Sequence, residues 1–340
     1  MMHLFMFFNV STVEDARTLI NYRIMFHVEI WMIIINLLHT LFFLRVTLNI
    51  KQYHRNWTNI QAFLYIQYSL HGLTWLAQRL IIICRLTEDN VELDNCLALI
   101  TSLIRTTCIF CSFYILLILT IERVFATFFL ESYETVRKQI LSFSLIILLV
   151  VLSVLSALFV HYFNGVFSNM LIFLVILINI TAAWLNNVIY EVNRKFNQTA
   201  QTHNKYSLGR RYQISENLKN WKMIRIPILT IAILNSILAA AMCISKIFTT
   251  NFTVIIIDFI ILMYTFIIPQ ITMRCSPLWR KEVQRSKQRL FSTSKVFSEP
   301  AEIQRPRIEV CNVFGKRLRT TQDVSEHFDN LQKMWEDNKF

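Results

Sequence analysis

The feature that most constrains this chain is a series of seven apolar blocks, each about as long as a lipid bilayer is thick. A helix that rises 1.5 Å per residue needs about 20 mostly apolar residues to cross the hydrocarbon core. Helices are the expected spanning structure, because lipid cannot satisfy a bare backbone and the alternating ten-residue segments typical of a barrel are missing from the sequence. The seven blocks are 24–48, 60–84, 97–121, 140–160, 170–190, 224–247 and 252–273.

The composition also indicates a membrane protein. Hydrophobic residues make up 54% of the 340 positions and charged residues only 16%, whereas a soluble domain carries about 25% charged residues. We therefore expect an all-α membrane protein folded as a seven-transmembrane helix bundle. Its predicted parts are an extracellular N-terminus at 1–23, the bundle with a short juxtamembrane helix at 24–290, and a mostly disordered cytoplasmic tail at 291–340.

Basic residues predict the orientation of the bundle. If the N-terminus lies outside, the cytoplasmic segments carry 20 lysines and arginines and the outer segments carry 5. Cytoplasmic loops of membrane proteins carry such an excess, so we expect an N-out, C-in protein of the plasma membrane. The net charge of +12 then faces anionic membrane lipids, and we expect no nucleic-acid partner. Asn9 begins an Asn-Val-Ser glycosylation sequence on the outer side, and its use is an open question.

Two cytoplasmic segments are predicted to be helical. Apolar residues recur at helical spacing from Ile214 to Ile224, which extends the sixth helix into the cytoplasm from about Gln213. The sixth membrane span itself opens with Pro227, a residue tolerated in a first turn. After the last span, residues 277–291 are basic and weakly amphipathic. They suit a short helix on the inner leaflet, although an ordinary basic juxtamembrane cluster is the alternative.

Two cysteines fall near the predicted outer face. Cys84 ends the second block and Cys96 precedes the third, with an acidic loop between them. A disulfide is permitted outside the cell. A Cys84–Cys96 bridge and a pair of free thiols are both open interpretations.

Two charges of opposite sign are predicted at similar depth in the bilayer. Arg105 lies about 12 Å into the third block and Asp258 about 9 Å into the seventh, at 1.5 Å per residue. A charge inside the membrane is costly and is by default a functional hypothesis. One interpretation is that one or both anchor a polar ligand group, and the other is a structural ion pair. His71 and Gln67 of the second block are further ligand-cavity candidates, with interhelical hydrogen bonding as the alternative.

No catalytic motif accompanies these residues. The chain has only 4 glycines and shows no glycine-rich phosphate loop, no His-Glu-x-x-His metal motif and no Gly-x-Ser-x-Gly elbow. We therefore predict neither an enzyme nor a metal or cofactor site.

Three sequence landmarks carry a family resemblance. The first is the run 121–134, with Glu122-Arg123, then Ala126-Thr127, then Tyr133-Glu134. The second is 207–217, which contains Arg211 and Glu216, and the third is Pro-Leu-Trp-Arg at 277–280. In this order and spacing they resemble the signature of the nematode serpentine chemoreceptors of class epsilon. The sibling alpha and beta classes share some of these features.

The resemblance implies a fold and a function. The fold would be that of a G-protein-coupled receptor, and the receptor would detect an environmental chemical in the cilia of sensory neurons. Its partners would be a small-molecule ligand and a heterotrimeric G protein. The coupling residues would be those of the first two landmarks, namely Glu122, Arg123, Tyr133, Glu134, Arg211 and Glu216.

The expected switch centres on Arg123. In the resting state its guanidinium would be held by Glu122, with Glu216 as a further candidate, and activation would release it toward the G protein. The alternative for this pair is a simple anchor at the membrane edge. The chain departs from rhodopsin-like receptors, because its seventh block ends Ile-Pro-Gln-Ile-Thr-Met instead of carrying Asn-Pro-x-x-Tyr.

A different class of function fits the same helix count. A seven-helix ligand-gated channel or a transporter would also span the membrane seven times. Such a channel of the insect olfactory type has its N-terminus inside, which the basic-residue distribution argues against. The broken helices of many transporters are not visible in the sequence.

Overall fold

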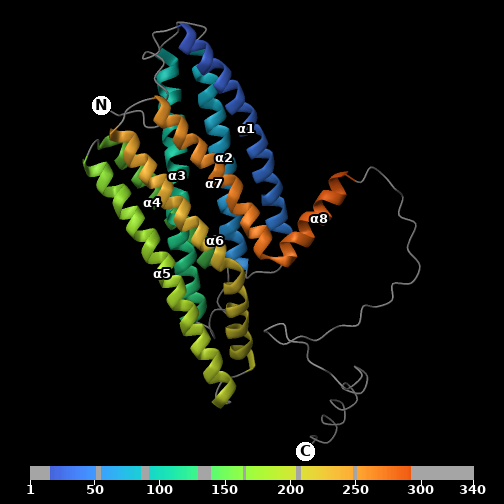
Figure 1. Ribbon diagram of the computed structural model, residues 1–340. Helices are drawn as coiled ribbons and strands as arrows, with labels where there is room; N and C mark the ends of the chain where they lie inside the picture. The colour runs from blue at the N-terminus through green and yellow to red at the C-terminus, as the bar shows by residue number, and fades with distance from the viewer. Residues whose placement is uncertain are drawn as a thin grey trace, which may run out of the picture. The chain divides into compact units, whose positions relative to one another are not determined.

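The computed structural model describes residues 16–50, 55–85, 92–128, 139–163, 166–203, 208–247 and 251–291. Within these ranges the chain is helical, and seven long helices lie side by side as a bundle, with an eighth, short helix after them (Figure 1). The predicted seven-helix bundle is confirmed. The helices are α1 (Ala16–Asn49), α2 (Arg55–Arg85), α3 (Glu92–Phe128), α4 (Gln139–Tyr162), α5 (Val166–His203), α6 (Leu208–Ile247), α7 (Asn251–Cys275) and α8 (Pro277–Phe291).

Six of the seven long helices are apolar enough over a sufficient length to cross a membrane, and α2 is the exception among them. At 31 residues α2 has the length, but it carries buried polar side chains such as Gln67, His71, Gln78 and Arg79. These side chains face other helices, so the polar groups of α2 lie inside the bundle and away from lipid. The predicted second span is therefore a helix, and it is less apolar than the other six spans.

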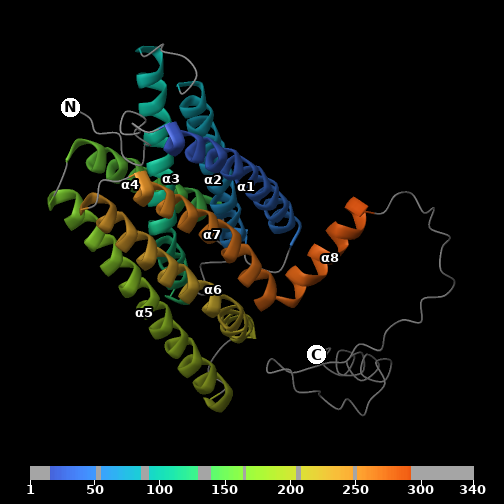
Figure 2. The ribbon, with the colours of Figure 1, turned by 45° about the horizontal axis from the view of Figure 1, so that its top comes forward.

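Helix α3 lies at the centre of the bundle and packs against α2, α4, α5 and α6. Figure 2 shows it between α2 and the α4–α6 group. Its side chains from Cys108 to Leu116 are buried almost without interruption. By contrast, α4 and α5 leave large apolar residues such as Ile147, Phe173 and Trp184 exposed, which is the pattern expected of helices that face lipid.

Three asparagines fix α5 against α3. Asn186 donates to the hydroxyl of Thr120 at 2.5 Å, and Asn193 donates to the hydroxyl of Thr127 at 2.9 Å. Asn179 donates to the backbone carbonyl of α3 residue 113 at 3.1 Å. Each donor is 66 positions after its acceptor, so the contacts repeat every seven residues along two parallel helices. This asparagine ladder sets the register between α3 and α5.

Helix α6 begins well before the membrane span that was predicted for it. It runs over 40 residues from Leu208 and contains Pro227 in its interior, so the expectation that Pro227 sits in a first turn is wrong. The polar stretch before it stays helical because Ile214, Leu218 and Trp221 are buried, as their spacing predicted. An interior proline has no amide hydrogen for the carbonyl four residues earlier and tends to bend a helix.

Helix α8 confirms the predicted helix at 277–291. It turns away from the axis of α7 in both views of the bundle (Figures 1 and 2). Trp279 is fully buried and stacks on Phe43 of α1 with ring centroids 6.1 Å apart. Val283 is also buried. We refer below to the end of the bundle that carries α8 as the α8 end, and to the other as the opposite end.

Candidate functional site

Asp258 of α7 is the centre of a buried charge cluster toward the opposite end of the bundle. One of its carboxylate oxygens accepts a hydrogen bond from Arg105 of α3, and the other accepts from Arg79 of α2 at 2.6 Å. All three side chains are 1% exposed. Arg79 also forms an ion pair with Glu29 of α1 at 2.5 Å. Four helices thus contribute two arginines and two carboxylates, which balance in charge when all are ionised.

The predicted link between Arg105 and Asp258 is present as a direct ion pair, and the cluster is larger than predicted. Neither Arg79 nor Glu29 was among the site residues predicted from the sequence, and the structure buries Arg79 inside α2. The sequence carried only a partial signal, because Gln67, His71 and Gln78 lie at helical spacing along one face of α2 and Arg79 is the residue after them.

Neutral side chains complete the coordination of Arg105. Its Nη1 donates to the carbonyl oxygen of Gln78 at 2.9 Å, and its Nε donates to Nε2 of His71 at 3.4 Å. The guanidinium also lies over the ring of Trp75, 5.0 Å from the centroid. Each nitrogen of Arg105 therefore already has a partner within the bundle.

A small cavity with about 10 Å³ of free room adjoins the cluster on the side toward the middle of the bundle. Gln67 and His71 line it, together with Tyr68 and Tyr264. The amide of Gln67 donates to Ser112 of α3 at 2.6 Å. Arg105 and Asp258 do not line this cavity, so of the four predicted ligand-cavity residues the structure brings two to its wall and holds the other two behind His71.

Three buried polar atoms of this cavity have unused hydrogen-bonding capacity. They are the side-chain carbonyl oxygen of Gln67 and the hydroxyl oxygens of Tyr68 and Tyr264, none of which forms a hydrogen bond within the described part of the chain. The two hydroxyls lie near each other, and their rings meet edge to face with centroids 5.9 Å apart. A buried polar group without a partner costs free energy, so this wall is suited to a guest that supplies partners.

Glu122 and Arg123 lie at the α8 end of α3. Arg123 donates to both carboxylate oxygens of Glu122, at 2.6 Å from Nε and 3.1 Å from Nη2. Both residues are buried. The guanidinium also lies over the ring of Trp57 of α2, 4.8 Å from the centroid. The predicted Glu122–Arg123 contact is present, and Trp57 is an additional partner that the sequence did not indicate.

Helix α6 reaches the same region through the second sequence landmark. Asn217 donates to the backbone carbonyl of Ala126 at 3.3 Å, close to Arg123 along α3. The backbones of Arg211 and Glu216 belong to α6, but their side chains lie outside those described. Tyr133 and Glu134 also fall outside the described residues, so their predicted coupling roles stay predictions.

The predicted sites at the opposite end are only partly within the described residues. Cys96 is an exposed free thiol in the structure, while the side chain of Cys84 is not among those described. The bridge between them stays a prediction. Asn9 and most of the predicted N-terminal segment lie outside the described residues, although α1 already begins at Ala16.

Comparison with known proteins identifies close matches over nearly the whole chain. A family model described as "Sre G protein-coupled chemoreceptor" matches residues 2–336. The chain is 24% identical over 318 residues to serpentine receptor class epsilon-12 of Caenorhabditis elegans, covering 88% of this chain and 89% of that receptor. It is 25% identical over 313 residues to class epsilon-8 of the same organism, with coverages of 86% and 88%. For class epsilon-13 the identity is 24% over 332 residues, with coverages of 92% and 91%.

Proposed function

Because this chain belongs to the Sre family of G protein-coupled chemoreceptors, we propose that it binds its chemical in the cavity beside Asp258 and signals through Arg123. The chain is a chemosensory G-protein-coupled receptor of the membrane, which is a receptor class and not an enzyme class. The comparisons lend nothing to the channel or transporter alternative. The proposal concerns the finer points, namely where the chemical binds, which residues couple to a heterotrimeric G protein, and how the receptor is oriented.

The single observation that supports the ligand site is the cavity wall with three unused polar atoms. The oxygens of Gln67, Tyr68 and Tyr264 gather on it without hydrogen bonds from the described part of the chain. Its free room in the structure is about 10 Å³, enough for about one water molecule, so in this proposal the surrounding helices move apart when a ligand binds. The expected ligand is therefore a small molecule that hydrogen-bonds to these groups.

The charge cluster supports an uncharged ligand. Both oxygens of Asp258 and all three nitrogens of Arg105 already have partners. A charged ligand would have to displace an ion pair whose loss leaves the other charge stranded, at about 3–5 kcal/mol. In this proposal Gln67 and His71 contact the ligand, while Arg105 and Asp258 position His71 and the surrounding helices.

The proposed output lies at the α8 end, which faces the cytoplasm in the N-out orientation. Arg123 is held by Glu122 and Trp57, and α6 contacts α3 close by through Asn217. A ligand that binds better to an arrangement in which α6 moves away shifts the population toward it. Arg123 is then free to meet a G protein. We place the receptor in the plasma membrane of sensory cilia.

The test begins with a screen of small uncharged compounds on cells that express the receptor with a promiscuous G protein. For an active compound, Tyr264→Phe removes one hydroxyl of the cavity and leaves the ring. We expect the half-maximal concentration to rise about tenfold, which corresponds to one hydrogen bond of about 1.4 kcal/mol. Tyr114→Phe is the matched control, since the Tyr114 hydroxyl contacts Ser156 of α4 at 2.8 Å and lies outside this cavity. Equal effects of the two changes would refute the proposed ligand site.

A further inference from the structure

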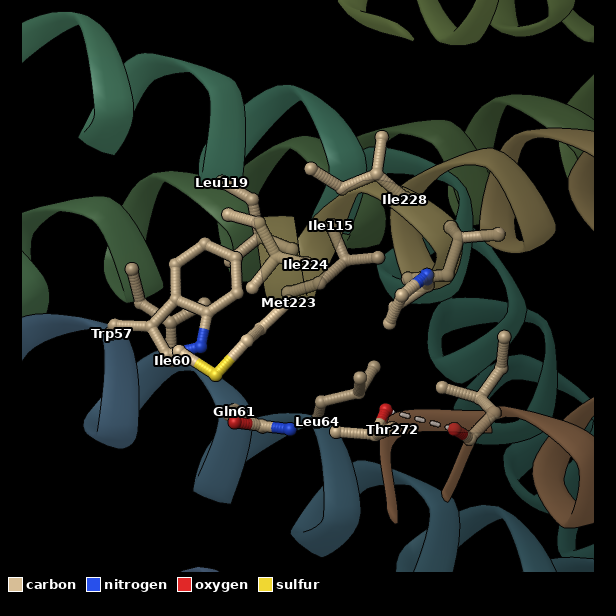
Figure 3. Close-up of a pocket in the computed structure, with 13 residues that line it drawn as sticks. Trp57, Ile60, Gln61, Leu64, Ile115, Leu119, Met223, Ile224, Ile228 and Thr272 are labelled. Carbon is tan, nitrogen blue, oxygen red and sulfur yellow. Dashed lines mark hydrogen bonds between the residues drawn. The ribbon is translucent and has the colours of Figure 1, made fainter. Parts of the chain in front are cut away.

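The face of α7 that meets α1 carries a polar pair near the α8 end of the bundle. Figure 3 shows the inner face of α7 at this level, where Thr272 points into the bundle and its hydroxyl donates to the carbonyl of Ile268. On a different face of the same turn, the amide nitrogen of Gln270 donates to Nε2 of His39 of α1 at 3.0 Å. His39 and Gln270 are both partly buried, so the pair lies where the bundle meets the bilayer.

The surroundings of this pair are apolar and exposed. On α7, Met263 and Phe266 are exposed, and on α1 the neighbouring Leu38 and Leu41 are exposed as well. Large apolar side chains on the outside of a membrane bundle face lipid. The polar pair is therefore set into a surface that is otherwise suited to hydrocarbon.

The side-chain oxygen of Gln270 is an unused acceptor. Within the described part of the chain, the amide nitrogen makes the bond to His39 and the oxygen accepts no hydrogen bond. The other ring nitrogen of His39, Nδ1, is buried, so Gln270 is the member of the pair that a lipid can reach. Hydrocarbon offers no hydrogen bond to such a group. A lipid that brings a donor to this point therefore binds better than one that brings none.

The depth of Gln270 selects the kind of donor. Arg274 lies one turn further along α7, in its last turn, and is exposed. Basic residues at the ends of spanning helices are anchored at the membrane interface, and four residues of helix place Gln270 about 6 Å inside that level. The interfacial layer is about 5–7 Å thick on each side. Gln270 thus lies where this layer gives way to hydrocarbon.

A sterol meets both requirements. Its hydroxyl, which can donate, is its only polar group, so it lies at the edge of the hydrocarbon with the rings inside. The ester groups of a phospholipid lie at a similar level but have no proton to donate. Phe266, one turn from Gln270, stacks on the His39 ring with centroids 4.5 Å apart. This exposed ring is held in place and offers a flat surface on which a rigid ring system gains many van der Waals contacts.

We propose that α1 and α7 form a sterol site in the leaflet at the α8 end, where the sterol hydroxyl donates to Gln270 and the rings pack on Phe266. The two helices are joined beside this site by the bond from Gln270 to His39, and one turn deeper by the bond from Asn36 to Thr265 at 2.8 Å. A sterol that lies across their boundary stabilises this contact. The site is independent of where the chemical binds and of the role of Arg123.

The binding test uses the full-length receptor in phosphatidylcholine nanodiscs, labelled with a photoactivatable cholesterol. The competitors are cholesterol and cholesteryl methyl ether, which keeps the rings but has no proton to donate. We expect cholesterol to displace the label from peptides of α1 and α7 at a mole fraction about five- to tenfold lower than the ether, a ratio that equals about 1–1.4 kcal/mol. Label spread evenly over the lipid-facing sides of α4 and α5 as well would overturn the proposal.

Two variants with matched controls test the two contacts. Gln270→Leu removes the acceptor and should make the two competitors equal, whereas Gln284→Leu on the exposed side of α8 should preserve the difference. Phe266→Ala removes the ring and should weaken both competitors alike, and Phe259→Ala, on an exposed residue two turns away along α7, should weaken neither. An undiminished preference for cholesterol in Gln270→Leu would refute the proposed hydrogen bond.

A stability measurement and a third lipid complete the test. Cholesterol should raise the Tm of the wild type saturably, and the ether should raise it less. Both comparisons are made on the wild-type receptor, so they do not depend on the folding of any variant. Ceramide also carries hydroxyl donors near the interface. Displacement of the label by ceramide and not by cholesterol would show that the site does not recognise sterols.

Discussion

The guanidinium of Arg123 is held by the carboxylate of Glu122, the residue directly before it in α3, at 2.6 Å and 3.1 Å. Neighbouring residues on a helix normally point in different directions, so this contact requires both side chains to bend toward the same buried space. Removal of either partner leaves a buried charge alone. Because only Arg123 is proposed to meet the G protein, we expect loss of the arginine to remove signalling and loss of the Glu122 charge to favour it.

Arg123→Ala should remove ligand-driven G-protein signalling. The arginine lies at the α8 end, and its planar guanidinium can exchange one partner for another. Arg225→Ala is the matched control, because Arg225 lies in α6 at the same end and is exposed. Signalling is compared at equal surface levels, measured with an N-terminal epitope. Normal signalling by Arg123→Ala would mean that the Glu122–Arg123 pair serves only as an anchor of α3 at the membrane edge.

Glu122→Gln should raise signalling in the absence of ligand. The amide keeps the shape of the side chain but no longer offers a full negative charge to Arg123. If the charge favours the resting state by about 1.4 kcal/mol, the active population rises about tenfold. Basal G-protein activity is measured against receptor number. A basal level below that of the wild type would show that Glu122 serves the active state.

Asp258→Asn should lower the amount of folded receptor at the surface. The change leaves Arg79 and Arg105 buried without a carboxylate between them, and stranding a buried charge costs about 3–5 kcal/mol. Phe259→Ala, at the next position and 53% exposed, controls for disturbance of α7. Cell-surface and total receptor are quantified together, and equal ratios for the two variants would contradict the prediction.

The orientation predicts the labelling of the two ends of the chain. An epitope at residue 2 should be accessible on intact cells, and one at residue 340 only after permeabilisation. The physical reason is the bias of 20 to 5 in basic residues between the two sides. The opposite labelling pattern would place the Glu122–Arg123 pair outside the cell and remove its proposed role.

Asn186→Leu should destabilise the receptor more than Asn187→Leu. Asn186 is buried and donates to Thr120 of α3, whereas Asn187 is exposed and donates only to its own helix. Interhelical hydrogen bonds in membranes contribute about 0.6 kcal/mol on average and up to about 1.7. The comparison is made by thermal unfolding in one detergent, and a lower Tm for Asn187→Leu would contradict the ladder.

The helix bundle could be predicted because the length of an apolar block is a direct consequence of bilayer thickness. The Arg105–Asp258 pair was also foreseeable, since two opposite charges at equal depth have few alternatives to meeting. Arg79 was missed because a charge near the end of a block looks the same whether it snorkels outward or packs inward. Only the position of Glu29 and Asp258 on other helices decides between these two cases.

The rest of the site depends on packing that no local pattern records. The seven-residue spacing of Asn179, Asn186 and Asn193 is visible in the sequence, but not the helix that they face. The cavity beside His71 depends on which side chains fail to fill space, and this follows from the three-dimensional fit of four helices. The cation–π contact between Trp57 and Arg123 likewise joins residues that are distant in sequence.

The asparagine ladder determines which motions the receptor has available. Sliding α5 along α3 by one residue would break all three contacts at once, and they match again only after a displacement of seven residues, about 10 Å. The pair α3 and α5 is therefore expected to move as one rigid unit. Helix α6 is hydrogen-bonded to this pair at Asn235, which donates to Asn179 at 2.8 Å and to the carbonyl of Ser112 at 3.1 Å, and again at Asn217, which donates to the carbonyl of Ala126. An outward movement of the α8 end of α6 therefore breaks the Asn217 contact first, while the Asn235 contacts can serve as its pivot.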